Sequence, residues 1–213
     1  MFIALIFWVF NVTLVSAQQS ASYVDLGLPS GTLWATCNVG AANPWEFGDY
    51  FAWGEIKSKT NYSMATYKYA AGRVDTYTKY CPYAFMGYNG FTDNLTILQS
   101  SDDAASVNMG SNWKMPTREQ YQELIDNCDY EWTSNYGGTG IKGAIFRSRK
   151  YTYLHIFFPM AGYYWKNERK FDTCHYWSSS GSGDGAEELH IDSNARVDVY
   201  LREYGLPVRA VRR

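Results

Sequence analysis

The sequence has little net charge, few cysteines and few histidines. Nineteen Lys and Arg residues stand against 21 Asp and Glu residues, which gives a formal net charge of −2 at pH 7. A nearly neutral chain has no general attraction to nucleic acid or to an anionic membrane, so we expect neither as a partner. The four cysteines form no C-x-x-C pair and no short-spaced set with the three histidines, which argues against a structural zinc site.

Linkers and repeats are also missing from the sequence. No internal repeat, run of like charge, or Pro- or Ser-rich stretch divides residues 23–213, so we expect a single domain there, preceded by a short polar lead at 18–22. Aromatic side chains are abundant instead, with 19 Tyr, 8 Trp and 11 Phe among 213 residues. This composition excludes intrinsic disorder, which requires few aromatic residues and a high net charge.

The first residues predict export. Residues 1–15 carry no charged side chain, and the apolar run at 2–10 is too short to cross a bilayer but long enough for a secretory signal. Val15 and Ala17 are small residues at positions −3 and −1 of a cleavage site, so we expect a signal peptide at 1–17. Because no Lys or Arg precedes the run, either the true start lies further upstream or the α-amino group alone supplies the positive end. An uncleaved helical anchor is the alternative.

The rest of the chain has no membrane-length apolar run, and no cysteine follows the small residues of the cleavage site. We therefore expect a protein that is secreted or held at the cell surface or in the periplasm, is not a lipoprotein, and has no membrane-spanning segment in its mature chain. In an oxidising compartment the cysteines can form two disulfides in three possible pairings, and buried free thiols are the alternative. The four are Cys37, Cys81, Cys128 and Cys174.

Two helices are expected in the middle of the chain. Ser100 or Ser101 can cap the first, whose first turn is acidic and whose end is marked by Gly110. Its two acids, Asp102 and Asp103, are also candidate oxygen ligands for calcium, although helix formation explains them without an ion.

The second helix begins at Thr117, which forms a capping box with Gln120. Its apolar residues recur at i, i+3, i+4 and i+7 and therefore face a core: Tyr121, Leu124, Ile125 and Cys128. Strands are expected at 33–39, 50–53, 144–146, 153–158 and 208–211.

Residues 188–202 show the clearest pattern in the chain. Apolar and polar residues alternate in two runs, which predicts an antiparallel hairpin with one buried and one solvated face. We place the turn at Ser193-Asn194-Ala195, because a two-residue loop sets Ile191 against Arg196 and divides the apolar residues between two faces. This register pairs Asp192 with Arg196, His190 with Asp198 and Glu188 with Tyr200.

The chain resembles a known family in six motifs that run in consistent order. They are YVDLGLPSGTLWATCNVG at 23–40, GDYFAWGE at 48–55, DDAA at 102–105, WKMPT at 113–117, YWSSS at 176–180 and VRAVR at 208–212. The family is the Fibrobacter succinogenes major paralogous domain of exported Bacteroidetes proteins, which resembles the C-type lectin-like fold of formylglycine-generating enzyme and of the variable proteins of diversity-generating retroelements.

The resemblance implies an α+β, C-type lectin-like fold over 23–213, with two helices packed on a small twisted antiparallel sheet and long loops. It also implies that Trp34, Trp53, Trp113 and Trp177 belong to the core. The formylglycine-generating enzymes use a pair of cysteines near the C-terminal end. Because Cys174 is alone in that region, oxidase chemistry is not carried over.

Short patterns elsewhere in the chain are typical of nucleotide-binding or catalytic sites, and each also has a structural interpretation. The letters G-x-G-x-x-G at 138–143 lead into a strand rather than a helix, so we interpret them as a flexible loop and not as a nucleotide site. Cys174 and His175 are sequence neighbours that point to opposite faces of a strand, which argues against a cysteine nucleophile. His155 lies in an apolar run and is expected in the core or at a sheet edge.

One face of the predicted hairpin carries groups able to bind a cation, namely Glu188, His190, Asp192 and Asp198. The alternative is a solvated face on which Arg196 and Arg202 balance the acids, and we favour it. We therefore assign no metal site, no catalytic residue and no cofactor from the sequence.

The remaining aromatic residues cluster just before this hairpin and favour recognition of a ligand. The candidate ligand-binding residues on the exposed face are Tyr163, Tyr164, Trp165, His175, Glu188, His190, Arg196, Asp198 and Tyr200. In the retroelement-diversified relatives, the same part of the fold contacts ligands. We therefore expect an exported, non-enzymatic domain that binds a glycan or a protein. The alternatives are a structural or assembly module of the cell envelope and an enzyme of the formylglycine-generating type.

Overall fold

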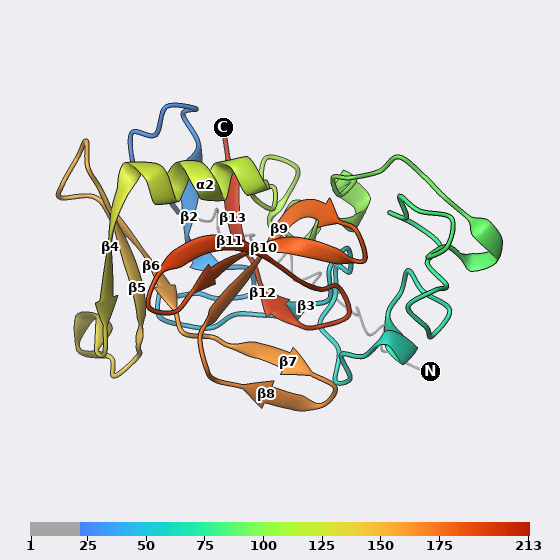
Figure 1. Ribbon diagram of the computed structural model, residues 1–213. Coiled ribbons are helices and arrows are strands. Elements are labelled where there is room, and N and C mark those ends of the chain that lie inside the picture. The colour runs from blue at the N-terminus through green and yellow to red at the C-terminus, as the bar shows by residue number, and fades with distance from the viewer. Residues whose placement is uncertain (1–21) are drawn as a thin grey trace, which may run out of the picture.

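Small antiparallel sheets make up most of the computed structural model, which describes residues 22–213 (Figure 1). The expected signal peptide at 1–17, and residues 18–21 of the polar lead, lie outside the described residues. The strands are β1 (Tyr23–Asp25), β2 (Leu33–Asn38), β3 (Tyr50–Phe51), β4 (Cys128–Thr133), β5 (Gly143–Ser148), β6 (His155–Pro159), β7 (Tyr163–Trp165), β8 (Glu168–Lys170), β9 (Cys174–Ser182), β10 (Gly185–Ile191), β11 (Ala195–Leu201), β12 (Leu206–Pro207) and β13 (Arg209–Arg212).

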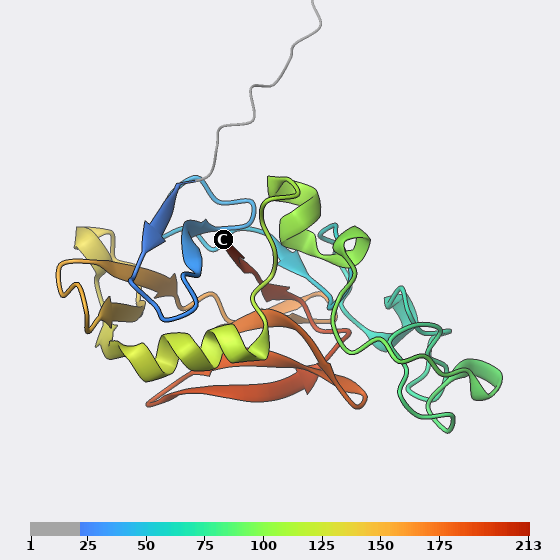
Figure 2. The same cartoon turned by 90° about the horizontal axis from the view of Figure 1, so that it is seen from above.

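The strands form five sheets, each of two or three strands. Their orders are β1-β2-β13, β11-β10-β9, β12-β3, β4-β5-β6 and β7-β8, and every pair within them is antiparallel. The α-helices are α1 (Ala104–Met109) and α2 (Arg118–Asn127), and short 3-10 turns lie at Met64–Thr66, Tyr88–Gly90, Ser100–Asp102 and Tyr136–Gly138. The sheet β11-β10-β9 lies directly beneath α2, and the hairpin β7-β8 lies on its other side (Figures 1 and 2).

The expected α+β, C-type lectin-like fold is therefore wrong. Strand accounts for 37% of the structure and helix for only 15%, and the strands are divided among several small sheets instead of forming one sheet under two helices. The physical reason lies in the first helix, which has only six residues and buries little more than Ala104 and Ala105. So short a helix cannot form a layer over a sheet.

Two apolar clusters fill the interior. One is built around Trp53 and Trp177, and the other around Trp34 and the α2 residues Tyr121 and Leu124. The four tryptophans expected in the core are all buried: Trp34, Trp53, Trp113 and Trp177. The expected apolar stripe of α2 is also confirmed, with Ile125 only half-buried and Cys128 starting β4.

The helix starts are set by side-chain caps. The capping box of α2 is confirmed, since Gln120 N donates to Thr117 Oγ1 over 3.3 Å and Thr117 N donates to Gln120 Oε1 over 2.9 Å. The cap of α1 is not Ser100 or Ser101 but Asp103, which accepts from Ser106 N. Asp103 takes this role because its second carboxylate oxygen also accepts from Met115 N, in the segment that leads to α2.

In the hairpin β10-β11 the apolar residues share one face, as expected. Each β10 residue, however, pairs with the β11 residue two positions before the expected one. Glu188 lies opposite Asp198 and His190 opposite Arg196, so the loop is Asp192-Ser193-Asn194. The shift arises because the carboxylate of Asp192 accepts from Asn194 N over 2.9 Å, which makes Asp192 the first residue of an Asx turn rather than the last residue of the strand.

The remaining expected strands are present with shifted ends. The regions 33–39, 144–146, 153–158 and 208–211 correspond to β2, β5, β6 and β13, and 50–53 contains the two-residue β3. His155 starts β6 and is half-buried. The G-x-G-x-x-G letters at 138–143 span the end of a 3-10 turn and the first residue of β5, so no helix follows them.

Side chains from residues 68–80 surround the buried carboxylate of Asp102. Asp102 accepts from the Lys79 ammonium and the Tyr80 hydroxyl, over 2.6 and 2.7 Å, and lies 3.3 Å from the Lys68 ammonium. Its oxygens are thus engaged by the chain itself and not arranged around an open position for calcium. Burial opposes ionisation of this carboxyl, but the hydrogen bonds outweigh it and lower the pKa of Asp102 to about 2.

We expect Asp102→Asn to lower the free energy of unfolding by about 2 kcal/mol at pH 7. The folded-state pKa of Asp102 lies below its ordinary value, so the carboxylate stabilises the fold above about pH 4, and this contribution disappears as the pH falls through 2. Urea unfolding of both proteins at pH 7 and near pH 2 measures the difference. The control is Asp75→Asn, which removes an exposed pair with Arg73 and should change nothing measurable. A loss of the same size at both pH values would contradict the assignment.

Candidate functional site

Three ionisable side chains converge on the face of the sheet β11-β10-β9 that is turned away from α2. His175 on β9 lies opposite His190 on β10, and Glu188 lies two residues from His190 along the same strand. Residues paired across a sheet, and residues two apart on one strand, share a face. The His175 Nδ1 therefore lies 2.9 Å from Glu188 Oε2, and the His190 Nδ1 lies 3.3 Å from Glu188 Oε1.

The expected solvated face is wrong for Glu188, and the expected exposure of His175 as a ligand-binding residue is wrong too. Glu188 is fully buried and His175 nearly so, while His190 keeps 14% of its side chain exposed. A buried carboxylate is costly unless it is paired, and here both imidazoles supply that pairing. The hydrogen bond to Glu188 raises the pKa of His190 above its ordinary value.

Each imidazole is also held at its second nitrogen. His175 Nε2 lies 2.6 Å from the Thr173 hydroxyl and 3.7 Å from an Asp172 carboxylate oxygen. His190 Nε2 lies 3.2 Å from Asp192 Oδ2. These outer contacts fix the orientation of both rings, so that the two Nδ1 atoms point at the carboxylate of Glu188. Sequence reasoning missed Asp172 and Thr173, although Thr173 lies two residues before His175 and thus on its face.

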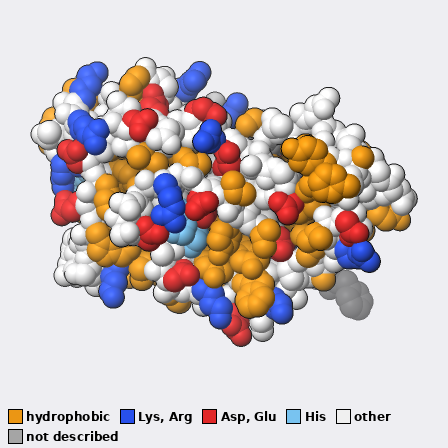
Figure 3. All heavy atoms as spheres, viewed as in Figure 1, with side chains coloured by type: hydrophobic (Ala, Val, Ile, Leu, Met, Phe, Trp, Pro, Cys, Tyr) orange, Lys and Arg blue, Asp and Glu red, His pale blue; other side chains and the backbone are white. Residues whose placement is uncertain are grey.

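Aromatic side chains cover the cluster. The Tyr163 and Tyr200 rings lie 5.1 and 4.9 Å from the His175 ring, between centroids. Tyr204 stacks on Tyr163 at 5.7 Å, and Trp165 stacks on Tyr204 at 6.4 Å. This layer explains the burial of Glu188. In Figure 3, hydrophobic side chains gather beside a small exposed area of histidine.

Tyr164 does not belong to this layer. Along β7 it points away from Tyr163 and Trp165, and its ring packs against Tyr50 and Tyr62 at 4.8 and 5.5 Å. Sequence reasoning missed Tyr204, which lies beyond the hairpin in a turn whose position depends on pairing between Gly205 and Tyr164. Tyr204 therefore replaces Tyr164 among the candidate ligand-binding residues.

Charged residues of the hairpin form an exposed rim next to the aromatic layer. Arg196 pairs with Asp192 and Asp198 over 2.9 and 3.3 Å. Hydrogen bonds from the Val199 backbone and from Arg196 lower the pKa of Asp198. Arg202, expected to balance these acids, is instead buried and donates to backbone carbonyls of other segments, so the rim has one guanidinium and not two.

The cysteines form no disulfide. All four thiols are free, three of them buried and Cys37 partly exposed. Cys174 packs in the apolar cluster on the face opposite to His175, and burial raises the pKa of its thiol well above the ordinary value. A thiolate at this position is therefore strongly disfavoured, which removes the neighbouring Cys174 and His175 as a nucleophile–base pair.

We expect one thiol per chain to react rapidly with Ellman's reagent in the native protein and four after denaturation, with no reductant present at any stage. Only Cys37 is accessible, and the reactive thiolate is disfavoured where the side chain is buried. Loss of the rapid phase in Cys37→Ser identifies the residue. Fewer than four thiols in the denatured protein would show that a disulfide is present.

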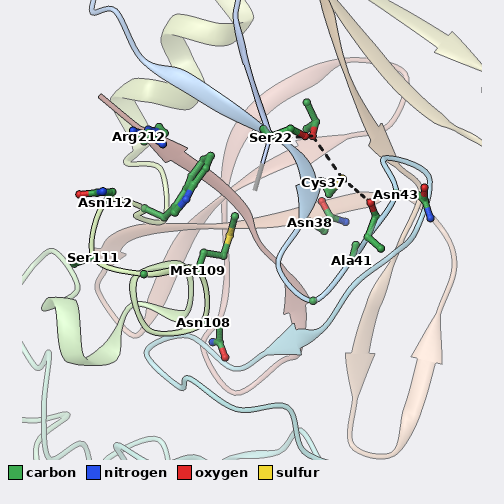
Figure 4. A pocket seen from close by; sticks show the side chains of 15 residues that line it. Ser22, Cys37, Asn38, Ala41, Asn43, Asn108, Met109, Ser111, Asn112 and Arg212 are labelled. Carbon is green, nitrogen blue, oxygen red and sulfur yellow. Dashed lines mark hydrogen bonds between the residues drawn. The ribbon is translucent and has the colours of Figure 1, made fainter. Parts of the chain in front are cut away.

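Another cavity lies away from this cluster, and both polar and apolar side chains line it. It has a volume of about 820 Å³ and lies between the loop after β2 and the loop after α1. Figure 4 shows Cys37 and Asn43 on one side, with Asn108 and Asn112 on the other and Arg212 above. Among the described residues that line it, none is acidic and none is a histidine, and the thiol of Cys37 is partly exposed there.

Comparisons with known proteins found no relative of this chain. The chain matches no family model, no curated protein and no solved structure. Within the part of the chain that the structure describes, no helix has the length and apolar character needed to cross a membrane.

Proposed function

We propose that this protein is an exported, non-enzymatic domain that binds a glycan or a protein through the aromatic layer and charged rim of β7, β10 and β11. The observation that carries the proposal is the exposed Trp165 stacked on Tyr204. Tyr204 packs in turn on Tyr200 of β11, the strand that also bears the ion pair of Arg196 and Asp198. Trp165 is 42% exposed although it is large and apolar. The resemblance to a family of exported proteins, and the apolar run at 2–10, support export.

The chemistry of this surface suits recognition. Tyr and Trp rings give a large, rigid contact area with a polar end, and they dominate binding energy where they meet a partner. The rings here are held in place by stacking, so little conformational entropy is lost when a ligand covers them. A shallow cavity of about 290 Å³ adjoins them, lined in part by Tyr200, Leu201 and Tyr204.

Two features support a non-enzymatic role: the state of the cysteines and the burial of the cluster formed by His175, Glu188 and His190. The enzyme alternative requires a pair of reactive cysteines, whereas Cys174 is alone, buried and opposite His175. Glu188 is covered by aromatic rings and held by both imidazoles, which keeps it from a substrate as large as a peptide. These features favour a binding surface over a catalytic one.

We expect Trp165→Ala and Tyr204→Ala each to weaken ligand binding about 10- to 100-fold without unfolding the protein. The ligand is first found by profiling the purified domain on glycan and protein arrays, and affinities are then measured by isothermal titration. Tyr153→Ala is the matched control, because it removes an aromatic side chain that is 76% exposed and lies outside β7 to β11, in the turn before β6. Equal affinities for all three variants would place the binding surface elsewhere.

A second candidate function, assembly with a partner chain, is favoured by β11. This strand lies at the edge of its sheet among the described strands, and it exposes Val199 and Leu201 on the other side from Tyr200. An unpaired edge with exposed apolar residues can accept a further strand.

If assembly is the function, replacing both Val199 and Leu201 with Asp should abolish association, while Trp165→Ala should leave it intact. Sedimentation velocity of the protein, alone and with a captured partner, measures association. A monomeric wild-type protein that captures no partner would rule this candidate out.

A further inference from the structure

We propose that His175, Glu188 and His190 bind one divalent transition-metal ion, with Zn²⁺ preferred, through two imidazole nitrogens and one carboxylate. This proposal does not rest on the proposed recognition function. It departs from the sequence-based assignment of no metal, because His175 comes from a strand whose pairing with β10 the sequence did not predict. The ligand atoms of the three residues all lie within 4.8 Å of one another.

The spacing of these atoms is close to that of a zinc site. Zinc lies about 2.0 to 2.2 Å from imidazole nitrogen and carboxylate oxygen, so neighbouring ligands of a tetrahedral site are about 3.3 to 3.5 Å apart. The carboxylate oxygens of Glu188 lie 2.9 Å from the Nδ1 of His175 and 3.3 Å from the Nδ1 of His190. These two contacts require movements of only a few tenths of an ångström to admit the ion, whereas ligand atoms as far apart as 4.8 Å must approach one another by about 1 Å.

The second nitrogen of each imidazole supports the same conclusion. A metal-bound histidine usually holds its other ring nitrogen against a carboxylate, a carbonyl or another polar oxygen, which fixes the ring. His190 Nε2 has Asp192 at 3.2 Å, and His175 Nε2 has the Thr173 hydroxyl at 2.6 Å. With both outer nitrogens engaged, the two Nδ1 atoms are directed at Glu188, and an ion that binds there replaces the Nδ1 protons now shared with its carboxylate.

Charge and donor chemistry select the kind of ion. Carboxylates of Asp172, Glu188 and Asp192 lie within 4 Å of the imidazole nitrogens, and only Asp192 among them pairs with Arg196. The cluster therefore carries an excess of negative charge that favours a cation. Two imidazoles suit zinc and its neighbours, whereas Ca²⁺ needs six to eight oxygen ligands that this site does not offer.

Three protein ligands leave a fourth position for water or for a group of a bound molecule. The rings of Tyr163 and Tyr200 limit the space on the His175 side. His190 is the one ligand with an exposed part, so the ion enters over its ring.

The test is a titration of the chelator-treated protein with ZnCl₂, followed by calorimetry and by metal analysis after gel filtration. We expect one Zn²⁺ per chain, and at least a 100-fold weaker affinity in His190→Ala and in Glu188→Gln. His155→Ala is the matched control, because it removes the remaining histidine of the chain and should bind as the wild type does. CaCl₂ should give no binding. Substoichiometric uptake by the wild type, or unchanged affinity in both ligand variants, would overturn the proposal.

Asp192→Asn tests the outer contact, and we expect it to weaken Zn²⁺ binding about 10-fold in a protein that remains folded without metal. Trp165→Ala should bind Zn²⁺ normally, which separates this proposal from the recognition function. Should a ligand variant fail to fold, histidine NMR signals of the wild type decide the matter. Zn²⁺ must shift two of the three imidazole signals and spare the one that is lost in His155→Ala; any other pattern refutes the site.

Discussion

The pairing of β9 with β10 is the constraint on which the C-terminal half of this molecule depends. Between Ala186 and Glu188 the register shifts, so that β9 advances by four residues while β10 advances by two. The extra residues of β9 find partners outside the sheet, since Ser179 N donates to the Pro116 carbonyl and Leu98 N donates to the Ser179 carbonyl. This bulge ties the sheet to the segment before α2, and it sets His175 opposite His190.

The polar cluster and the aromatic layer are two consequences of this register. Once His175 and His190 share a face, Glu188 lies between them and water is displaced from its carboxylate. Burial of that charge is tolerated because both imidazoles point at it, and the rings of Tyr163 and Tyr200 then pack over the cluster. The ionic cluster thus lies beneath an aromatic layer. This packing holds the exposed rings of the layer in fixed positions.

Local features of this fold could be predicted from the sequence, whereas pairings between distant segments could not. Thr117 and Gln120 are three residues apart, so their capping box follows from side-chain chemistry alone. The alternation of apolar and polar residues correctly predicted which hairpin residues share a face. The register depended on one hydrogen bond of Asp192, which moved the turn by one residue and the strand pairing by two. The expected two-helix architecture failed because α1 stops after six residues. In the site, the hairpin residues were anticipated, whereas Tyr204 and the partners of His175 come from segments that only tertiary structure brings close.

The free state of the four thiols bears on how this fold is maintained. A chain without cross-links keeps the full conformational freedom of its unfolded ensemble, so noncovalent packing alone must balance that entropy. The buried tryptophan and tyrosine rings of the two apolar clusters supply the contact area for this. The protein should consequently fold in a reducing cytosol as readily as in an oxidising medium, and glutathione should leave its architecture untouched.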